Sequence, residues 1–187
     1  MTGNIAEDWG LSFSDLMFLA DQPDDVRLET ALQLCHLRRT SRFIEDWSDL
    51  AGDLISYVAS QTERPADCPK SLFDDRRSRR YRKRVAEHLG FSRPTRENLT
   101  DFDIWLTTDV VQRGTSLSEM TDLGCHWFLA RKLVSPPEQT VERIIRSARQ
   151  RVLDGYLTAV AAQLSVPSAA ELEASLADPR AAPDFND

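Results

Sequence analysis

Seven positively charged side chains lie within the nine residues from position 76 to position 84. Positive charge at this density suits phosphate contacts, because each cation that neutralises a phosphate releases condensed counterions. A helix turns by about 100° per residue, so the segment spreads its charge around the circumference and several cations must project into solvent. We expect DNA or RNA contact here; the alternative is a solvated face that forms salt bridges with the acidic N-terminal third. The candidate phosphate contacts are Arg76, Arg77, Arg79, Arg80, Arg82, Lys83 and Arg84.

A second candidate site follows the short turn at 133–136, which joins two expected helices. The later helix alternates apolar residues such as Val141 and Ile145 with arginines, so one stripe packs while the other can reach a groove. Two helices joined in this way resemble a helix-turn-helix, whose second helix enters the major groove of DNA. The alternative is an ordinary pair of packed helices, which gives a similar pattern. The candidate residues near a groove are Gln139, Arg143, Arg146 and Arg149.

Two Cys-His pairs, Cys35-His36 and Cys125-His126, are candidates for a metal site or a thiol nucleophile. Adjacent residues on a helix point about 100° apart, so neither pair shares a ligand geometry easily. Buried cysteines beside surface or capping histidines are the expected arrangement. The sequence also lacks the glycine, histidine and serine motifs of nucleotide-binding and hydrolytic sites. We therefore expect no enzyme activity, no metal and no cofactor.

Length and composition indicate a globular protein, with 187 residues of which 41% are hydrophobic and 28% are charged. No apolar run approaches the roughly 20 residues that span a bilayer, and residues 1–9 lack the regions of a signal peptide. We expect a cytoplasmic protein without a membrane partner. The three cysteines, Cys35, Cys68 and Cys125, are widely spaced, so we expect reduced and mostly buried thiols.

The net charge of −7 conceals a division of charge along the chain. Residues 1–70 carry a net charge of −7, residues 71–151 carry +5, and residues 152–187 carry −5. The overall negative charge argues against a nonspecific coat on nucleic acid. The basic middle of the chain is where a polyanion would dock.

Hydrophobic residues recur at helical spacing and strand signals are nearly absent, so we expect an all-α protein. Pro65 and Pro69 mark the expected boundary between two small helical subdomains, the second with the helix-turn-helix-like hairpin and a long helix. The expected units are an N-terminal helical subdomain at 1–64, a linker at 65–70, a basic helical DNA-binding subdomain at 71–177 and a flexible tail at 178–187.

Capping boxes mark several helix starts, because a serine hydroxyl accepts a backbone N–H while an acid three residues later reaches back. The boxes pair Ser12 with Asp15, Ser71 with Asp74 and Ser116 with Glu119, and Ser135 is the expected cap of the long helix. The expected helices cover about 12–22, 25–39, 50–58, 71–89, 99–111, 117–133 and 137–164, with a further turn or two at 168–176. The residues expected in the core rather than as base-stacking platforms are Trp9, Trp47, Trp105 and Trp127.

Several segments follow one another in a recognisable order. They are Ile5-Ala6-Glu7-Asp8-Trp9 with Leu11-Ser12, the run 28–38 with Arg42-Phe43, Tyr57-Val58-Ala59-Ser60-Gln61, the arginine-rich helix leading to His88-Leu89-Gly90-Phe91, Trp105-Leu106, the turn 133–137, Val141-Glu142-Arg143 and Ala148-Arg149. This order resembles the N-terminal region of Tn-three-family transposases, the large enzymes of replicative transposons. The likeness extends to about residue 176, and its most specific part is the run 31–38.

The resemblance implies a function in binding. In that family the helical N-terminal region recognises the terminal inverted repeats of the transposon, while a much later domain supplies the metal-binding acidic triad. The sequence departs from the family at 63–70, where the family has a longer and more apolar linker, and in its acidic first subdomain. The resemblance therefore implies a DNA-binding module without chemistry of its own.

The expected partner is double-stranded DNA at transposon ends, clamped between the arginine-rich helix and the helix that follows Pro137. Phosphate contacts would give affinity, and two or three side chains would read base edges. A full-length transposase and a second copy of the chain are the other candidate partners. The alternative function is a protein-interaction or regulatory module acting on a full-length transposase, with the acidic first subdomain as its contact surface.

Overall fold

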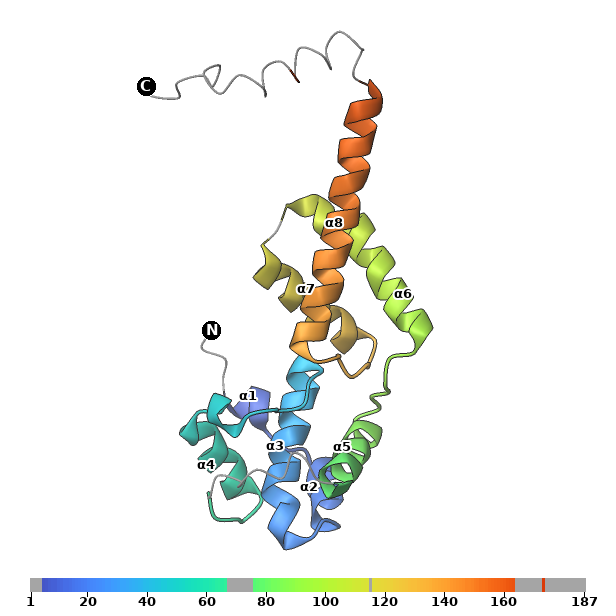
Figure 1. Ribbon diagram of the computed structural model, residues 1–187. Coiled ribbons are helices and arrows are strands. Elements are labelled where there is room, and N and C mark those ends of the chain that lie inside the picture. The colour runs from blue at the N-terminus through green and yellow to red at the C-terminus, as the bar shows by residue number, and fades with distance from the viewer. Residues whose placement is uncertain (1–4, 67–75, 115, 164–172, 174–187) are drawn as a thin grey trace, which may run out of the picture.

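The computed structural model describes residues 5–66, 76–114, 116–163 and 173, and within these ranges it contains eight α-helices and no strand (Figure 1). This confirms the expected all-α class. The last helix is the longest, as expected. The helices are α1 (Ile5–Trp9), α2 (Phe13–Ala20), α3 (Asp24–Thr40), α4 (Gly52–Gln61), α5 (Arg76–His88), α6 (Arg96–Trp105), α7 (Leu117–Ala130) and α8 (Glu138–Gln163).

The predicted caps explain where two of these helices begin. Ser12 and Asp15 form a capping box at α2, and Ser116 and Glu119 form another at α7. A third box, between Thr95 and Asn98, starts α6. It was not predicted, because the residue at its N3 position, Asn98, is an amide rather than an acid. The predicted box at 71–74 lies outside the described residues, as does the helix expected at 168–176 except for residue 173.

One hydrophobic cluster forms around α3, whose Leu32, Leu34 and Leu37 are fully buried. Side chains of α1, α2 and α4 surround it, and Trp9 and Trp47 are part of it, as predicted. Helix α5 also belongs to this cluster, because Val85 is buried there and α5 packs directly on α3. The basic helix therefore rests on the N-terminal half of the molecule.

A second cluster is built by α6, the π-helical segment Leu106–Val110 that continues it, α7 and the first half of α8. Aromatic rings form its centre: the ring of Phe102 lies 4.8 Å from that of Phe128 and 5.1 Å from that of Trp127, between centroids. Trp105 and Trp127 pack in this cluster as predicted. These tilted rings join α6 to α7, and α8 packs against both helices.

The two clusters meet where α3 ends and α8 begins. The backbone N–H of Ser135 donates to the carbonyl oxygen of Ser41 over 2.7 Å, and Arg42 pairs with Glu138 over 2.8 Å. The segment after α5 joins the turn before α8, since Ser92 exchanges backbone hydrogen bonds with Lys132 and Val134. The predicted division at 65–70 lies largely outside the described residues and stays a prediction, while side-chain packing groups α5 with the helices before it.

Helix α8 continues well past the second cluster and projects from the body of the molecule (Figure 1). Its outer half leaves large apolar side chains exposed by about half, namely Leu153, Tyr156, Leu157 and Val160. Among the described residues, no helix combines the length and apolar character needed to cross a membrane.

Candidate nucleic-acid interface

Helix α5 presents positive charge on the face opposite the one it buries. Tyr81 and Val85 are buried, and residues two positions away from Tyr81 on either side point about 160° from it at helical spacing. Those residues are Arg79 and Lys83, and both are exposed, as is Arg80. The prediction that several cations of this segment project into solvent is confirmed. The side chains of Arg76 and Arg77 lie outside the described part of the structure.

Two other arginines of α5 turn toward the first cluster instead. The Arg82 guanidinium donates to the carbonyl oxygen of Ile44 over 3.1 Å and lies over the ring of Phe43. Burial lowers the pKa of Arg82, which Glu45 and Glu29 partly oppose. Arg84 donates to Oε1 of Gln22 over 2.9 Å and lies over the ring of Phe18. These contacts partly match the alternative to nucleic-acid binding, because both arginines bond to oxygens of the N-terminal third and Arg82 also interacts with the charges of Glu45 and Glu29.

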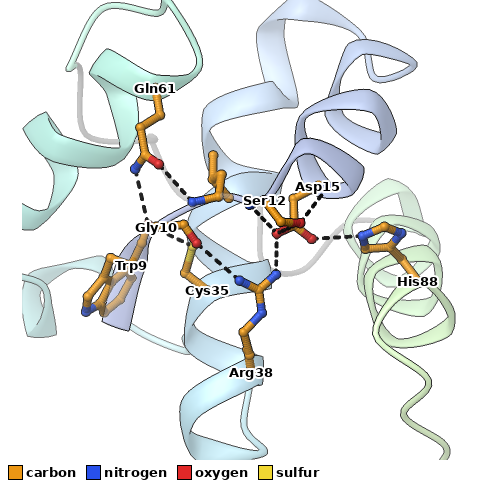
Figure 2. A network of polar contacts seen from close by, with 9 residues as sticks. Trp9, Gly10, Ser12, Asp15, Cys35, Arg38, Gln61 and His88 are labelled. Atoms are coloured by element: carbon orange, nitrogen blue, oxygen red, sulfur yellow. Dashed lines mark hydrogen bonds and ion pairs between the residues drawn. The ribbon is translucent and has the colours of Figure 1, made fainter. Parts of the chain in front are cut away.

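The end of α5 is fixed by a polar network around Asp15 (Figure 2). One carboxylate oxygen of Asp15 accepts from Arg38, from the hydroxyl of Ser12 and from the Ser12 backbone N–H, and the other lies 2.9 Å from Nε2 of His88. These hydrogen bonds outweigh the effect of burial and lower the pKa of Asp15 to about 2. The network thus joins α2, α3 and α5 through one ionised carboxylate.

Serine, aspartate and histidine meet in this network, but in an order that does not suit hydrolysis. The hydroxyl of Ser12 donates to Asp15, and the imidazole of His88 contacts the other oxygen of the same carboxylate. A nucleophilic serine needs the imidazole beside its hydroxyl as a general base, with the carboxylate behind the imidazole. The Phe18 ring also stacks on His88 with centroids 4.3 Å apart. The arrangement serves to hold α5 against α2.

In helix α8, the buried side chains and the exposed stripe of polar and charged side chains lie on opposite faces. In α5, two arginines lie on the side that contacts the first cluster. Val141, Ile145 and Ala148 are buried in the second cluster. Gln139, Arg143 and Arg146 are exposed and point roughly 140–200° from Val141 at helical spacing, so they form a stripe on the opposite face. Arg149 is exposed beside this stripe, and Arg146 pairs with Glu142 over 3.0 Å.

Additional exposed cations lie between the two basic helices. Arg93 belongs to the segment that links α5 to α6, Arg96 is the first residue of α6, and Arg131 and Lys132 belong to the turn before α8. Backbone hydrogen bonds from Ser92 to this turn bring the two segments together. These residues could not be predicted from the sequence, because each lies outside the basic run and becomes part of a basic surface only through folding.

An open hollow of about 480 Å³ lies between α6 and α8. Its charged residues include Arg96 from the first turn of α6 and Arg143 from α8. Arg151, also from α8, closes one side through an ion pair with Asp103 and a hydrogen bond to Ser147. The complete lining is Arg96, Leu99, Thr100, Asp103, Arg143, Ile144, Ser147 and Arg151.

A cleft of about 690 Å³ runs between the two clusters and carries charges of both signs. Burial, followed by the nearby Arg39 and Arg42, lowers the pKa of His36 to about 4. The neutral imidazole is what a buried site favours. Because Arg42 faces Glu138 across the same cleft, the cleft offers no excess of either charge.

The Cys-His pairs do not assemble a metal or nucleophile site. Cys35 is buried, as expected, and its thiol donates to the carbonyl oxygen of Trp9, while burial raises its pKa to about 12. Cys125 is half-buried and its pKa is also raised by burial. Within the described residues, no three histidine, cysteine or acidic side chains gather as metal ligands would. Cys68 lies outside the described residues.

Comparison with protein families places most of the chain in one of them. The profile of a family described as a domain of unknown function, DUF4158, matches residues 2–148. The matched region includes α1 to α7 and the start of α8 up to residue 148, and so contains helix α5, the α8 residues Arg143 and Arg146, and the hollow between α6 and α8 up to Ser147. No curated protein matches the chain.

Proposed function

This chain belongs to the DUF4158 family, and we propose that it acts as a module that binds double-stranded DNA and has no catalytic centre of its own. The resemblance of its sequence to the N-terminal region of Tn-three-family transposases supports the terminal inverted repeats of a transposon as the DNA it recognises. The function proposed is therefore the recognition of DNA ends.

The observation that carries this proposal is the stripe of α8. Val141 and Ile145 fix the helix in the second cluster, and the opposite face presents Gln139, Arg143 and Arg146 to solvent. A helix held firmly at its base with exposed amide and guanidinium groups along its outer face fits the major groove, where such groups pair with base edges. In the described part of the chain, Arg143 and Arg149 form no ion pair, so their charge is available.

Helix α5 supplies the second half of the proposed clamp. Its exposed cations Arg79, Arg80 and Lys83 suit phosphate contacts. Arg82 and Arg84 are better assigned to holding α5 in place, because both already contact the first cluster. Phosphate contacts from α5 would give affinity without sequence preference. Contacts of α8 with base edges would give the preference for one DNA sequence.

The test is fluorescence-anisotropy binding to two labelled duplexes, one with the inverted repeat flanking the encoding locus and one scrambled. A protein with 6–10 phosphate contacts loses about 10³–10⁵ in affinity between 50 and 200 mM salt. We expect salt-sensitive binding with preference for the repeat. An absence of binding to both duplexes at 50 mM salt would rule out the proposed function.

A second candidate function rests on the outer half of α8. Leu153, Leu157 and Val160 are exposed at helical spacing, and an exposed apolar stripe of this kind marks a surface for another protein. A regulatory module that binds a full-length transposase would use it. The variant R79Q/R80Q/K83Q separates the two functions, because it removes DNA retention in the first and leaves capture of the transposase intact in the second.

A further inference from the structure

We propose that the hollow between α6 and α8 seats the sugar-phosphate backbone of one DNA strand, with Arg96 and Arg143 as its phosphate ligands. This inference rests on the proposed DNA-binding function and deepens it by assigning a place and a chemistry to one strand. The hollow lies beside the outer stripe of α8, since Arg143 belongs to both. A helix in the major groove has a phosphate backbone on each side, so a seat beside it is where a strand would pass.

The lining suits a deoxyribose flanked by phosphates. Leu99 and Ile144 are half-buried and supply an apolar surface that can contact the C–H groups of a sugar. Arg96 and Arg143 approach from the two helices, and a guanidinium binds phosphate oxygens through two parallel N–H donors. A hollow that combines apolar side chains with two cations matches the alternation of sugar and phosphate along a strand.

The charge balance leaves these two arginines available. Of the three arginines in the hollow, Arg151 is already paired with Asp103, the single acid among the lining residues. Arg96 and Arg143 are exposed, and neither forms an ion pair within the described part of the chain. The hollow thus keeps an excess of two positive charges.

Helix α6 adds to the same preference. Arg96 is its first residue, and the hydroxyl of Thr95 occupies the backbone N–H of Asn98 and leaves other first-turn N–H groups uncapped. A helix start favours an anion through its dipole. The single acid in this turn, Glu97, does not line the hollow. Dipole and side-chain charge therefore act together at the α6 edge of the hollow.

The experiment compares R96Q, R143Q and the double variant with R113Q, in the full chain. Arg113 is exposed in the 3₁₀ turn Val111–Arg113 and does not line the hollow, so R113Q makes the same change in net charge as each single variant, at another place on the surface. Binding is measured by anisotropy with the repeat and the scrambled duplex at several salt concentrations, and thermal unfolding checks the fold. Each lost phosphate contact should lower the slope of log K against log salt by about 0.9, and the double variant by about 1.8.

We expect R96Q and R143Q to weaken both duplexes to the same extent, because phosphates carry no sequence. If the double variant binds like R113Q while the unsubstituted protein binds strongly, the hollow does not bind a DNA strand, and the proposed function stands. If R143Q instead removes the preference for the repeat, Arg143 reads a base and its assignment to phosphate is wrong. If the unsubstituted protein binds neither duplex, the proposed function itself fails.

A final arm distinguishes a DNA strand from a free anion as the occupant. Inorganic phosphate replaces chloride at constant ionic strength during the duplex titration. An unchanged affinity for the duplex supports a hollow that binds a DNA strand and does not bind free phosphate. Competition by millimolar phosphate that disappears in R96Q/R143Q would show a site for free phosphate and would overturn the proposal.

Discussion

Helix α5 turns two of its arginines toward the core beneath it, whereas Arg143 and Arg146 of α8 lie on the side away from its core. Arg82 and Arg84 contact Ile44 and Gln22 in the first cluster, and α5 is fixed further by His88 at its end. Helix α8 is anchored by the buried side chains of Val141, Ile145 and Ala148, and its ion pairs with the rest of the molecule, Glu138 with Arg42 and Arg151 with Asp103, use neither of these two arginines. The number of cations in a segment therefore overstates the charge it can offer, because some of that charge is used to hold the segment.

The way in which each helix is held also explains the role that we expect it to have in DNA binding. Helix α5, which polar contacts hold in place, can present three cations to phosphates. Contacts between these cations and phosphates tolerate small shifts in the position of the helix. A helix held by close packing against aromatic rings keeps its outer face in a defined register, as reading of base edges requires. We therefore expect affinity from α5 and sequence preference from α8.

The largest expected effect comes from removing the charge of each helix in turn. R143Q/R146Q/R149Q should lower DNA affinity by about 100-fold or more and abolish the preference for the repeat, with the salt slope reduced by only about 0.9, because Arg143 alone among the three is assigned to a phosphate. R79Q/R80Q/K83Q should reduce the slope by about 2.7 and keep the preference. Anisotropy titrations with both duplexes measure this. Equal loss of preference in the two triple variants would remove the distinction between the helices.

A smaller effect is expected when the anchor of α5 is broken. D15A leaves Arg38 and His88 without the carboxylate that pairs with them, and we expect a loss of about 2–3 kcal/mol in the free energy of unfolding. Urea unfolding measures it. D21A is the matched control, because Asp21 is an exposed acid at the end of the same helix and should change stability by less than about 0.5 kcal/mol. A loss in D15A no larger than in D21A would show that the network does not hold α5.

Within α5 itself, inward and outward arginines should behave in opposite ways. R82A removes the hydrogen bond to Ile44 and the contact with Phe43, which together stabilise by about 1–2 kcal/mol. R79A should leave stability within about 0.5 kcal/mol and lower DNA affinity several-fold. Thermal unfolding and anisotropy on both variants give the comparison. The assignment fails if R79A destabilises more than R82A.

Sequence periodicity predicted most of this fold because helix positions depend on local spacing and local caps. It predicted the helices corresponding to α2 to α8 and two of the three capping boxes, and it missed the short α1. The partners of Asp15 could not be predicted, because Arg38 and His88 lie 23 and 73 residues away. For the same reason, the inward turn of Arg84 toward Gln22 has no local signal, since 62 residues separate the two.

Acid should loosen α5 and leave the arginines of α8 charged, and this is the smallest effect we expect. Asp15 has its pKa lowered from 3.8 to about 2, so its contribution to stability is complete above pH 3.8 and is lost as the pH falls through 2. Because solvent reaches Arg38 and screens the pair, we expect a loss of about 1 kcal/mol in the free energy of unfolding rather than the full value of the pKa shift.

Urea unfolding of the unsubstituted chain and of D15N between pH 4.5 and 2 measures this loss. The low pKa of His36 adds a loss on acidification that is common to both proteins, so the difference between their pH profiles isolates Asp15. Parallel profiles would mean that the Asp15 network adds no acid-sensitive stability, and α5 would then depend on packing as α8 does.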